Sequence, residues 1–169
     1  MHHQVMMLDE EIGSPLSIES LGWMAAPGSN SSASYNNFEI YMGLCDADVL
    51  TSNFENNYIS GTRTLVFSNP SLAVNATVGG WFTLNLDSPF EYNGTDNLLV
   101  EIVWESGTNS IYVYKWNTGT VRSLKGASFS AETGVIGSDV YMIDLISSQG
   151  FSQESVAWIK ANAFGGDSE

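Results

Sequence analysis

Four acidic residues in predicted turns have the chemistry of a calcium site. Hard divalent cations prefer carboxylate and carbonyl oxygens, and the loops at the ends of β-sandwiches can supply them. Two of these acids belong to a Cys-Asp-Ala-Asp segment, and the other two flank a predicted hairpin turn: Asp46, Asp48, Asp87 and Asp96. None belongs to a regularly spaced set of acids such as an EF-hand loop. The sequence leaves two interpretations open, a calcium site and ordinary solvated turn residues.

Three aromatic residues could form a second kind of site. Tyr112, Tyr114 and Trp116 alternate along the segment 110–116, which is predicted to be a strand. Alternation places the three side chains on one face of that strand, and sugars stack on flat aromatic faces. If this face is exposed, it is a platform for a carbohydrate ligand. If a second sheet covers it, the same residues belong to the core.

The sequence contains no recognisable catalytic motif. Its two histidines, His2 and His3, stand at the start of the chain, so we expect no interior histidine for a catalytic triad or a metal site. Glu101 and Glu105 could in principle act as the carboxylate pair of a glycosidase. Their place on one strand and at its end makes outward-pointing surface charge the expected role. We therefore predict that the protein is not an enzyme.

Charge and composition restrict the partners further. The net charge is −14, from 19 Asp and Glu against 5 Lys and Arg. Such a field repels a phosphate backbone, so nucleic acid is not an expected partner. The longest apolar runs are only as long as a strand, so a membrane-embedded segment is not predicted either. The single cysteine, Cys45, excludes an internal disulfide and is expected to be a buried, inert thiol.

Apolar and polar residues alternate with a period of two along most of the chain, which is typical of strands with one buried face. The pattern predicts strands at 3–8, 16–23, 35–44, 62–67, 81–87, 98–104, 110–116, 121–129 and 139–146. Pro70 and Pro89 are expected to end strands, because proline cannot donate to a ladder. The sequence therefore predicts an all-β, two-sheet antiparallel β-sandwich over residues 1–146. Residues 147–169 are expected to be a C-terminal tail or a short helix.

Two sequence blocks resemble a known family. The first is NFEIYMG at 37–43, which follows IESLGW at 18–23, and the second is the long run GWFTLNLDSPFEYNGTDNLLVEI at 80–102. Together they resemble a jelly-roll-like β-sandwich module of large secreted, adhesin-type surface proteins of Bacteroidota and related candidate phyla, often exported by type IX secretion. The resemblance implies an extracellular or cell-surface location and no catalytic residues.

Three functions remain open at this point. The first is a non-catalytic extracellular module for adhesion or recognition, with other cell-surface proteins as partners. The second is a structural subunit of an extracellular filament, in which the segment 1–12 of one copy completes the sheet of the next. The third is a carbohydrate-binding module that holds glycans on the face of Tyr112, Tyr114 and Trp116.

Overall fold

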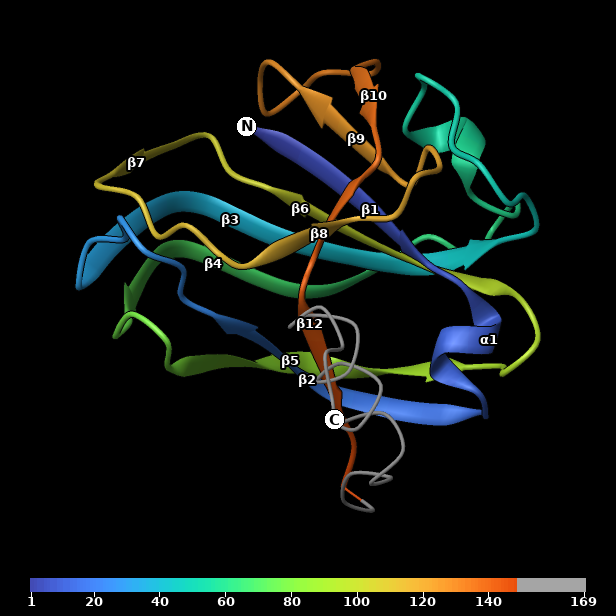
Figure 1. Cartoon of the computed structure of the whole chain (residues 1–169), viewed down its shortest axis with the longest axis horizontal. Helices are drawn as coiled ribbons and strands as arrows, with labels where there is room; N and C mark the ends of the chain where they lie inside the picture. The colour runs from blue at the N-terminus through green and yellow to red at the C-terminus, as the bar shows by residue number, and fades with distance from the viewer. Residues whose placement is uncertain (149–169) are drawn as a thin grey trace, which may run out of the picture.

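Strands make up most of the protein in the computed structural model, which describes residues 1–148 (Figure 1). The strands are β1 (His2–Met7), β2 (Leu16–Met24), β3 (Ser32–Cys45), β4 (Thr64–Asn75), β5 (Trp81–Tyr92), β6 (Asn97–Val103), β7 (Ser106–Thr108), β8 (Lys115–Asn117), β9 (Ser123–Gly126), β10 (Val135–Gly137), β11 (Asp139–Tyr141) and β12 (Ile143–Ile146). A helical turn, α1 (Asp9–Ile12), follows β1, and a 3-10 turn at Glu55–Asn57 lies in the loop after β3.

The strands form two facing antiparallel sheets (Figure 1). The larger sheet has the order β10-β9-β1-β6-β3-β4, with β7 also paired to β3. The smaller sheet has the order β12-β2-β5, and a separate ladder joins β8 to β11. This arrangement confirms the predicted all-β sandwich. Within residues 1–148, no helix is both long enough and apolar enough to cross a membrane.

The core between the sheets is built from the alternating apolar residues that the pattern predicts. Phe38, Ile40 and Met42 of β3 are buried together with Leu98 and Val100 of the neighbouring β6. Because side chains alternate between the two faces of a strand, each strand contributes every second residue to this cluster. The smaller sheet closes the cluster from the other side with Ile18, Leu21, Trp23, Phe90 and Tyr92.

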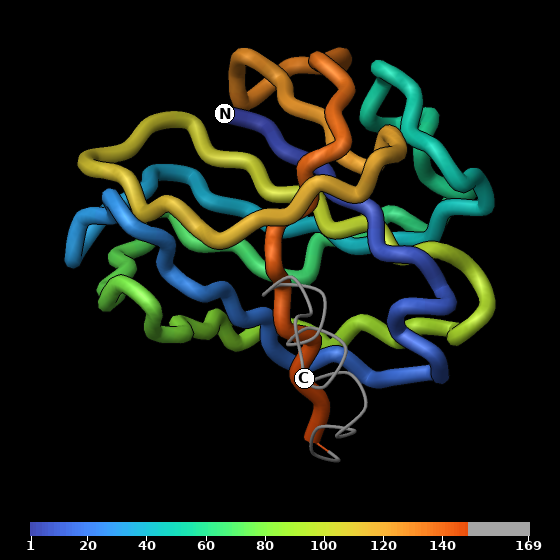
Figure 2. The backbone as a smooth tube through the Cα atoms, in the orientation of Figure 1, coloured from blue at the N-terminus to red at the C-terminus, as the bar shows by residue number. Residues whose placement is uncertain are grey.

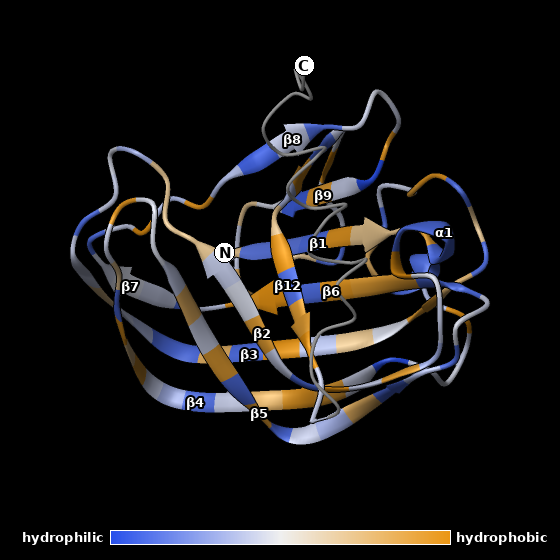
Figure 3. Cartoon of the chain, turned by 60° about the horizontal axis from the view of Figure 1, so that its bottom comes forward, coloured by the Kyte–Doolittle hydropathy of each residue, from blue (hydrophilic) through white to orange (hydrophobic). Residues whose placement is uncertain are grey.

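Part of the outer face of the larger sheet is covered as well. Leu50, Phe54 and Tyr58 of the loop 46–63 pack against Met6 and Leu99 of the sheet. With neighbouring residues, these five side chains form a second buried cluster. Strand β6 is therefore buried on both faces, and most of its length is coloured as hydrophobic in Figure 3. The same cluster includes the Cys45 thiol, which confirms the buried, free cysteine expected from the sequence.

Two predicted strand ends are wrong, because Pro70 lies within β4 and Pro89 within β5. Each of these strands is the last one of its sheet. An edge strand leaves alternate N–H groups without a ladder partner, so a proline at such a position removes no hydrogen bond. Pairing is also irregular at both places: Asn37, which lies opposite Pro70, has a φ of 50°, and the register of β2 against β5 shifts beside Pro89.

The strand predicted over 110–116 is also wrong. Only its last two residues belong to a strand, β8, and Val113 forms a single bridge to Ala25. The short helix α1 was not expected, and it ends at Gly13, whose φ of 85° is in the left-handed region that favours glycine. Apart from its first two residues, the predicted tail or helix at 147–169 lies outside the described residues.

The segment 109–114 instead connects the two sheets. It follows β7, which is paired to the larger sheet, and reaches the end of β2 in the smaller sheet. There the Ala26 N–H donates to the Tyr112 carbonyl at 2.8 Å, and the Tyr114 N–H donates to the Met24 carbonyl at 3.1 Å. Figure 2 shows this part of the chain crossing the open side between the two layers.

The contact between the loop 46–63 and the sheet can be tested at Gly43. A Cβ atom at this position would lie 2.5 Å from the ring of Tyr58. Gly43→Ala should therefore displace Tyr58 and lower the free energy of unfolding by about 1–3 kcal/mol, measured by urea denaturation. Ser60→Ala, an exposed change in the same loop, is the control. Equal stability of the two variants would contradict this packing.

Candidate functional site

The four acids predicted to bind calcium do not form one ligand set. Asp46, Asp48 and Asp96 lie near the Cys45 thiol. Burial raises the pKa of this thiol, a hydrogen bond to the Ala47 backbone opposes that effect, and the negative charges of the three acids add to it. Asp87 lies elsewhere, on β5, where its Oδ2 accepts the Ser68 N–H at 2.7 Å. Within residues 1–148, no three His, Cys, Asp or Glu side chains are grouped closely enough to hold a metal ion.

The three predicted aromatic ligands also separate. Tyr112 is exposed, Tyr114 is partly buried, and both line a cavity between the two sheets. Trp116 lies on β8 opposite Val140 of β11 and packs against the core. Because the segment 110–116 is irregular, the period-two rule that placed all three rings on one face does not apply there. Two of the three residues are therefore brought to a common site.

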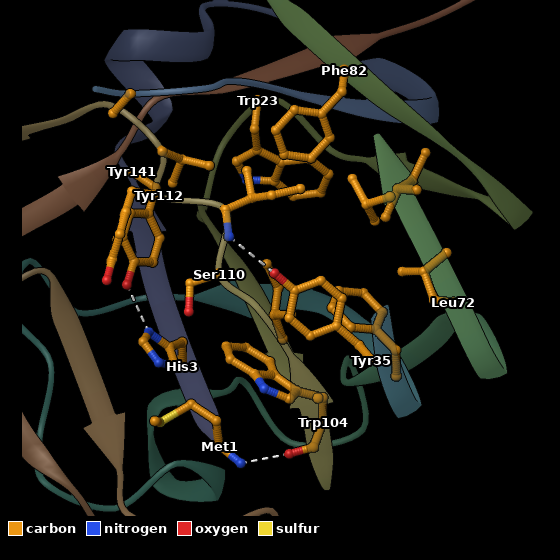
Figure 4. Close-up of a pocket in the computed structure, with 18 of the residues that line it drawn as sticks. Met1, His3, Trp23, Tyr35, Leu72, Phe82, Trp104, Ser110, Tyr112 and Tyr141 are labelled. Atoms are coloured by element: carbon orange, nitrogen blue, oxygen red, sulfur yellow. Dashed lines mark hydrogen bonds between the residues drawn. The ribbon is translucent and has the colours of Figure 1, made fainter. Parts of the chain in front are cut away.

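This cavity has a volume of about 800 Å³ (Figure 4). Ligand sites for small molecules typically enclose roughly 300–1,000 Å³ and have mostly apolar walls with a few placed polar groups. The aromatic part of the lining is Trp23, Tyr35, Phe38, Phe82, Trp104, Tyr112, Tyr114 and Tyr141. Aliphatic side chains complete it, among them Leu72, Val74, Leu84, Ile102, Ile111 and Val113. The cavity therefore has the size and the walls of a small-molecule site.

Ring contacts within each sheet hold the walls of the cavity in place. On the larger sheet Trp104 stacks with Phe38 at 6.1 Å between ring centroids and meets the edge of Tyr35 at 5.5 Å. On the smaller sheet Trp23 stacks with Phe82 at 5.9 Å. Aromatic pairs in these geometries add about 0.5–1.5 kcal/mol each beyond their buried area. Each wall is thus supported by ring contacts within its own sheet, and the space between the walls is present without a bound ligand.

A polar cluster stands at one side of the cavity. His3 Nδ1 lies 2.7 Å from the Tyr141 hydroxyl (Figure 4), and the His3 ring stacks on Trp104 at 5.4 Å. Burial, and after it the charge of Lys125, lowers the pKa of His3 to about 4. Burial also raises the pKa of Tyr141 to about 12, with a smaller contribution from Asp139. Both side chains are therefore uncharged at neutral pH and able to hydrogen-bond to a ligand.

No spacing in the sequence groups His3, Lys125 and Tyr141, because they come from β1, β9 and β11. The long-range pairing of β1 with β9 brings His3 directly opposite Lys125. The sequence offers one signal for this cluster: the whole chain has only 5 Lys and Arg, so each of these cations, Lys125 included, is a candidate for a specific role.

Two predictions about titratable groups are wrong. His2 and Glu101 were expected to be terminal and outward-pointing, and they are 6% and 0% exposed. Their strands β1 and β6 are central strands of the larger sheet, and the loop 46–63 covers the outer face on which both side chains lie. The alternation within a strand shows which residues share a face. It does not show that a loop covers the outer face, so the burial of His2 and Glu101 could not be predicted from it.

The Glu101 carboxylate is fully engaged by its neighbours. It accepts hydrogen bonds from His2 Nε2 at 2.9 Å, Gln4 Nε2 at 3.0 Å, the Tyr58 hydroxyl at 2.8 Å and Arg63 Nη2 at 2.7 Å. Burial alone would raise the pKa of Glu101, but these hydrogen bonds and the charge of Arg63 outweigh burial and hold the pKa at about 2. Four partners leave little capacity for a substrate, so this carboxylate has a structural role.

Glu105 does not complete a catalytic pair with Glu101. Its side chain is exposed just after β6 and accepts a hydrogen bond from the Asn37 amide.

Comparison of the chain with protein-family models, with curated proteins and with solved structures found no match. The cavity between the sheets is therefore the feature from which a function can be proposed.

Replacing Glu101 should destabilise the protein strongly. Glu101→Gln keeps the size of the side chain but removes the buried carboxylate partner of Arg63, which then keeps only the exposed Glu55 carboxylate at 3.8 Å. We expect this change to cost about 3 kcal/mol of unfolding free energy. Because the folded-state pKa of about 2 is below the ordinary 4.5, the stabilisation is complete above pH 4.5 and is lost as the pH falls toward 2. The difference between the two proteins should therefore shrink on acidification.

Urea denaturation at pH 7 and at a series of acidic pH values measures both effects. Glu105→Gln removes an exposed carboxylate at the end of the same strand and should change the unfolding free energy by less than about 0.5 kcal/mol. If Glu101→Gln lowers the unfolding free energy no more than Glu105→Gln does, the hydrogen bonds around Glu101 do not stabilise the fold.

Proposed function

We propose that this domain is a non-catalytic extracellular recognition module that holds its ligand in the cavity between the two sheets. The observation that carries the proposal is the aromatic cavity of about 800 Å³, whose walls come from both sheets. A preformed apolar site lowers the entropic cost of binding, because few side chains need to be ordered by the ligand. The blocks at 18–23, 37–43 and 80–102, which resemble secreted adhesin-type modules, support the extracellular location.

The chemistry of the cavity favours binding over catalysis. General acid–base catalysis needs a group whose pKa lies near the working pH, whereas His3 has a pKa of about 4 and Tyr141 of about 12. The most strongly engaged carboxylate, Glu101, lies on the opposite face of the larger sheet, among its own partners. The described lining therefore offers surfaces and hydrogen bonds to a ligand, without a poised acid, base or nucleophile.

Strand donation into a filament has less support. Strand β1 is paired on one side with β6 and on the other with β9 of its own chain. A donated β1 would have to leave both ladders and expose His2, Gln4 and Glu101, which are buried polar groups. A glycan ligand is supported by the aromatic rings, but the aliphatic part of the lining offers no partners for sugar hydroxyls.

An uncharged aromatic probe tests the proposal directly. N-phenyl-1-naphthylamine becomes fluorescent in apolar sites, and we expect it to bind with saturation at one site per chain. Ser110 is exposed at the cavity (Figure 4), so Ser110→Phe should obstruct entry and weaken binding about tenfold, or ~1.4 kcal/mol.

Thr95→Phe is the matched control, because it adds the same ring to an exposed turn that does not line the cavity. This variant should bind the probe as the unaltered protein does, and both variants should keep the original melting temperature. Absence of saturable binding, or equal binding by both variants, would refute the cavity as the binding site.

A further inference from the structure

The charged residues that line the cavity are positive, whereas the chain as a whole is strongly negative. Acidic residues outnumber Lys and Arg by 19 to 5 over the sequence. Among the described residues that line the cavity, however, two are lysines, Lys115 and Lys125, and none is Asp or Glu. A solvated acidic surface would not produce this local reversal. The cavity is thus a site of positive charge in a strongly negative protein.

The two lysines differ in their availability. Lys115 forms an ion pair with Asp139 across the β8–β11 ladder, so most of its charge is compensated. Lys125 lies directly opposite His3 in the β1–β9 ladder, and its Nζ is 5.9 Å from the centre of the Tyr141 ring. Among residues 1–148, no carboxylate forms an ion pair with Lys125. Its charge does act on Asp139, whose pKa is lowered by hydrogen bonds from Lys115 and Asn117 and further by the charge of Lys125. Lys125 is nevertheless the lysine that is more available to an anionic ligand, because it forms no direct ion pair.

We propose that the ligand is an amphiphile with an apolar body and an anionic carboxylate head. The body lies among the aromatic and aliphatic walls, and the head lies at Lys125, within reach of His3 and Tyr141. The inference rests on the proposed binding function and adds the chemical class of the ligand to it. A charge-assisted hydrogen bond from a lysine to a carboxylate is about twice as strong as a neutral one.

Other ligand classes fit the cavity less well. A cationic amphiphile would bring a second positive charge to Lys125 without a carboxylate in the lining to receive it. A neutral oligosaccharide would place hydroxyl groups against Leu72, Leu84 and Ile102, where they lose hydrogen bonds to water and gain none. An anionic amphiphile satisfies both parts of the site, the apolar walls and the unpaired cation.

The test is displacement of N-phenyl-1-naphthylamine by three ligands that share a ten-carbon chain: decanoate, 1-decanol and decyltrimethylammonium, all below their aggregation concentrations. We expect decanoate to bind about tenfold more tightly than 1-decanol, which is ~1.4 kcal/mol, and decyltrimethylammonium to bind most weakly. The preference for decanoate should decrease at high salt, because Lys125 is an exposed residue and salt screens its charge.

Lys125→Gln should abolish the preference for decanoate over 1-decanol, measured as the ratio of the two affinities within the same variant. Asn56→Asp is the matched control, since it lowers the net charge by the same amount at an exposed position of the loop 46–63, away from the cavity. The control should keep the preference of the unaltered protein.

Equal affinity for decanoate and 1-decanol, or a preference that survives Lys125→Gln, would overturn the anionic ligand while leaving probe binding in place. Displacement of the probe by a neutral oligosaccharide such as cellobiose, without displacement by decanoate, would overturn it in favour of a glycan. Absence of probe binding in every variant would refute the proposed function, and the ligand class with it.

Discussion

The Glu101 carboxylate accepts hydrogen bonds from side chains of β1 and of the loop 46–63, and this buried contact organises the larger sheet. A carboxylate removed from water is stable only while its partners stay in place, so β1, β6 and the loop are held as one unit. A slip of β1 by one residue would move His2 and Gln4 to the other face of the sheet. The β1–β6 register that brings His2 and Gln4 to Glu101 on the outer face also places His3 at the cavity on the inner face.

The cavity exists because the sandwich is not closed by regular strands on that side. The segment 109–114 crosses between the sheets there with one bridge and a few backbone hydrogen bonds. Large rings on the facing strands stack within their own sheet, as Trp104 does with Phe38 and Trp23 with Phe82.

The sequence predicts the part of the fold that depends on local patterns. Alternation identified β2, β3, β5 and β6, since each has one face on the common core. It could not show that Pro70 and Pro89 stand on edge strands, because edge position depends on the order of strands in the sheet. The burial of Glu101 was equally invisible, because the loop that covers it comes from another part of the chain. Alternation does not explain the positions of Tyr112 and Tyr114, because they line the cavity from an irregular segment.

The position of β1 at the centre of the larger sheet also determines when this protein can finish folding. As the chain is synthesised, β1 emerges before the other described strands, yet its two neighbours are β6 and β9, which follow much later. Folds dominated by such distant pairings form slowly, because a long loop must close before any of the contacts is made. Until then His2, His3 and Gln4 lack the neighbouring strands that bury them, and the wall of the cavity that includes His3 is incomplete. The cavity is therefore among the last features of the molecule to form during its synthesis.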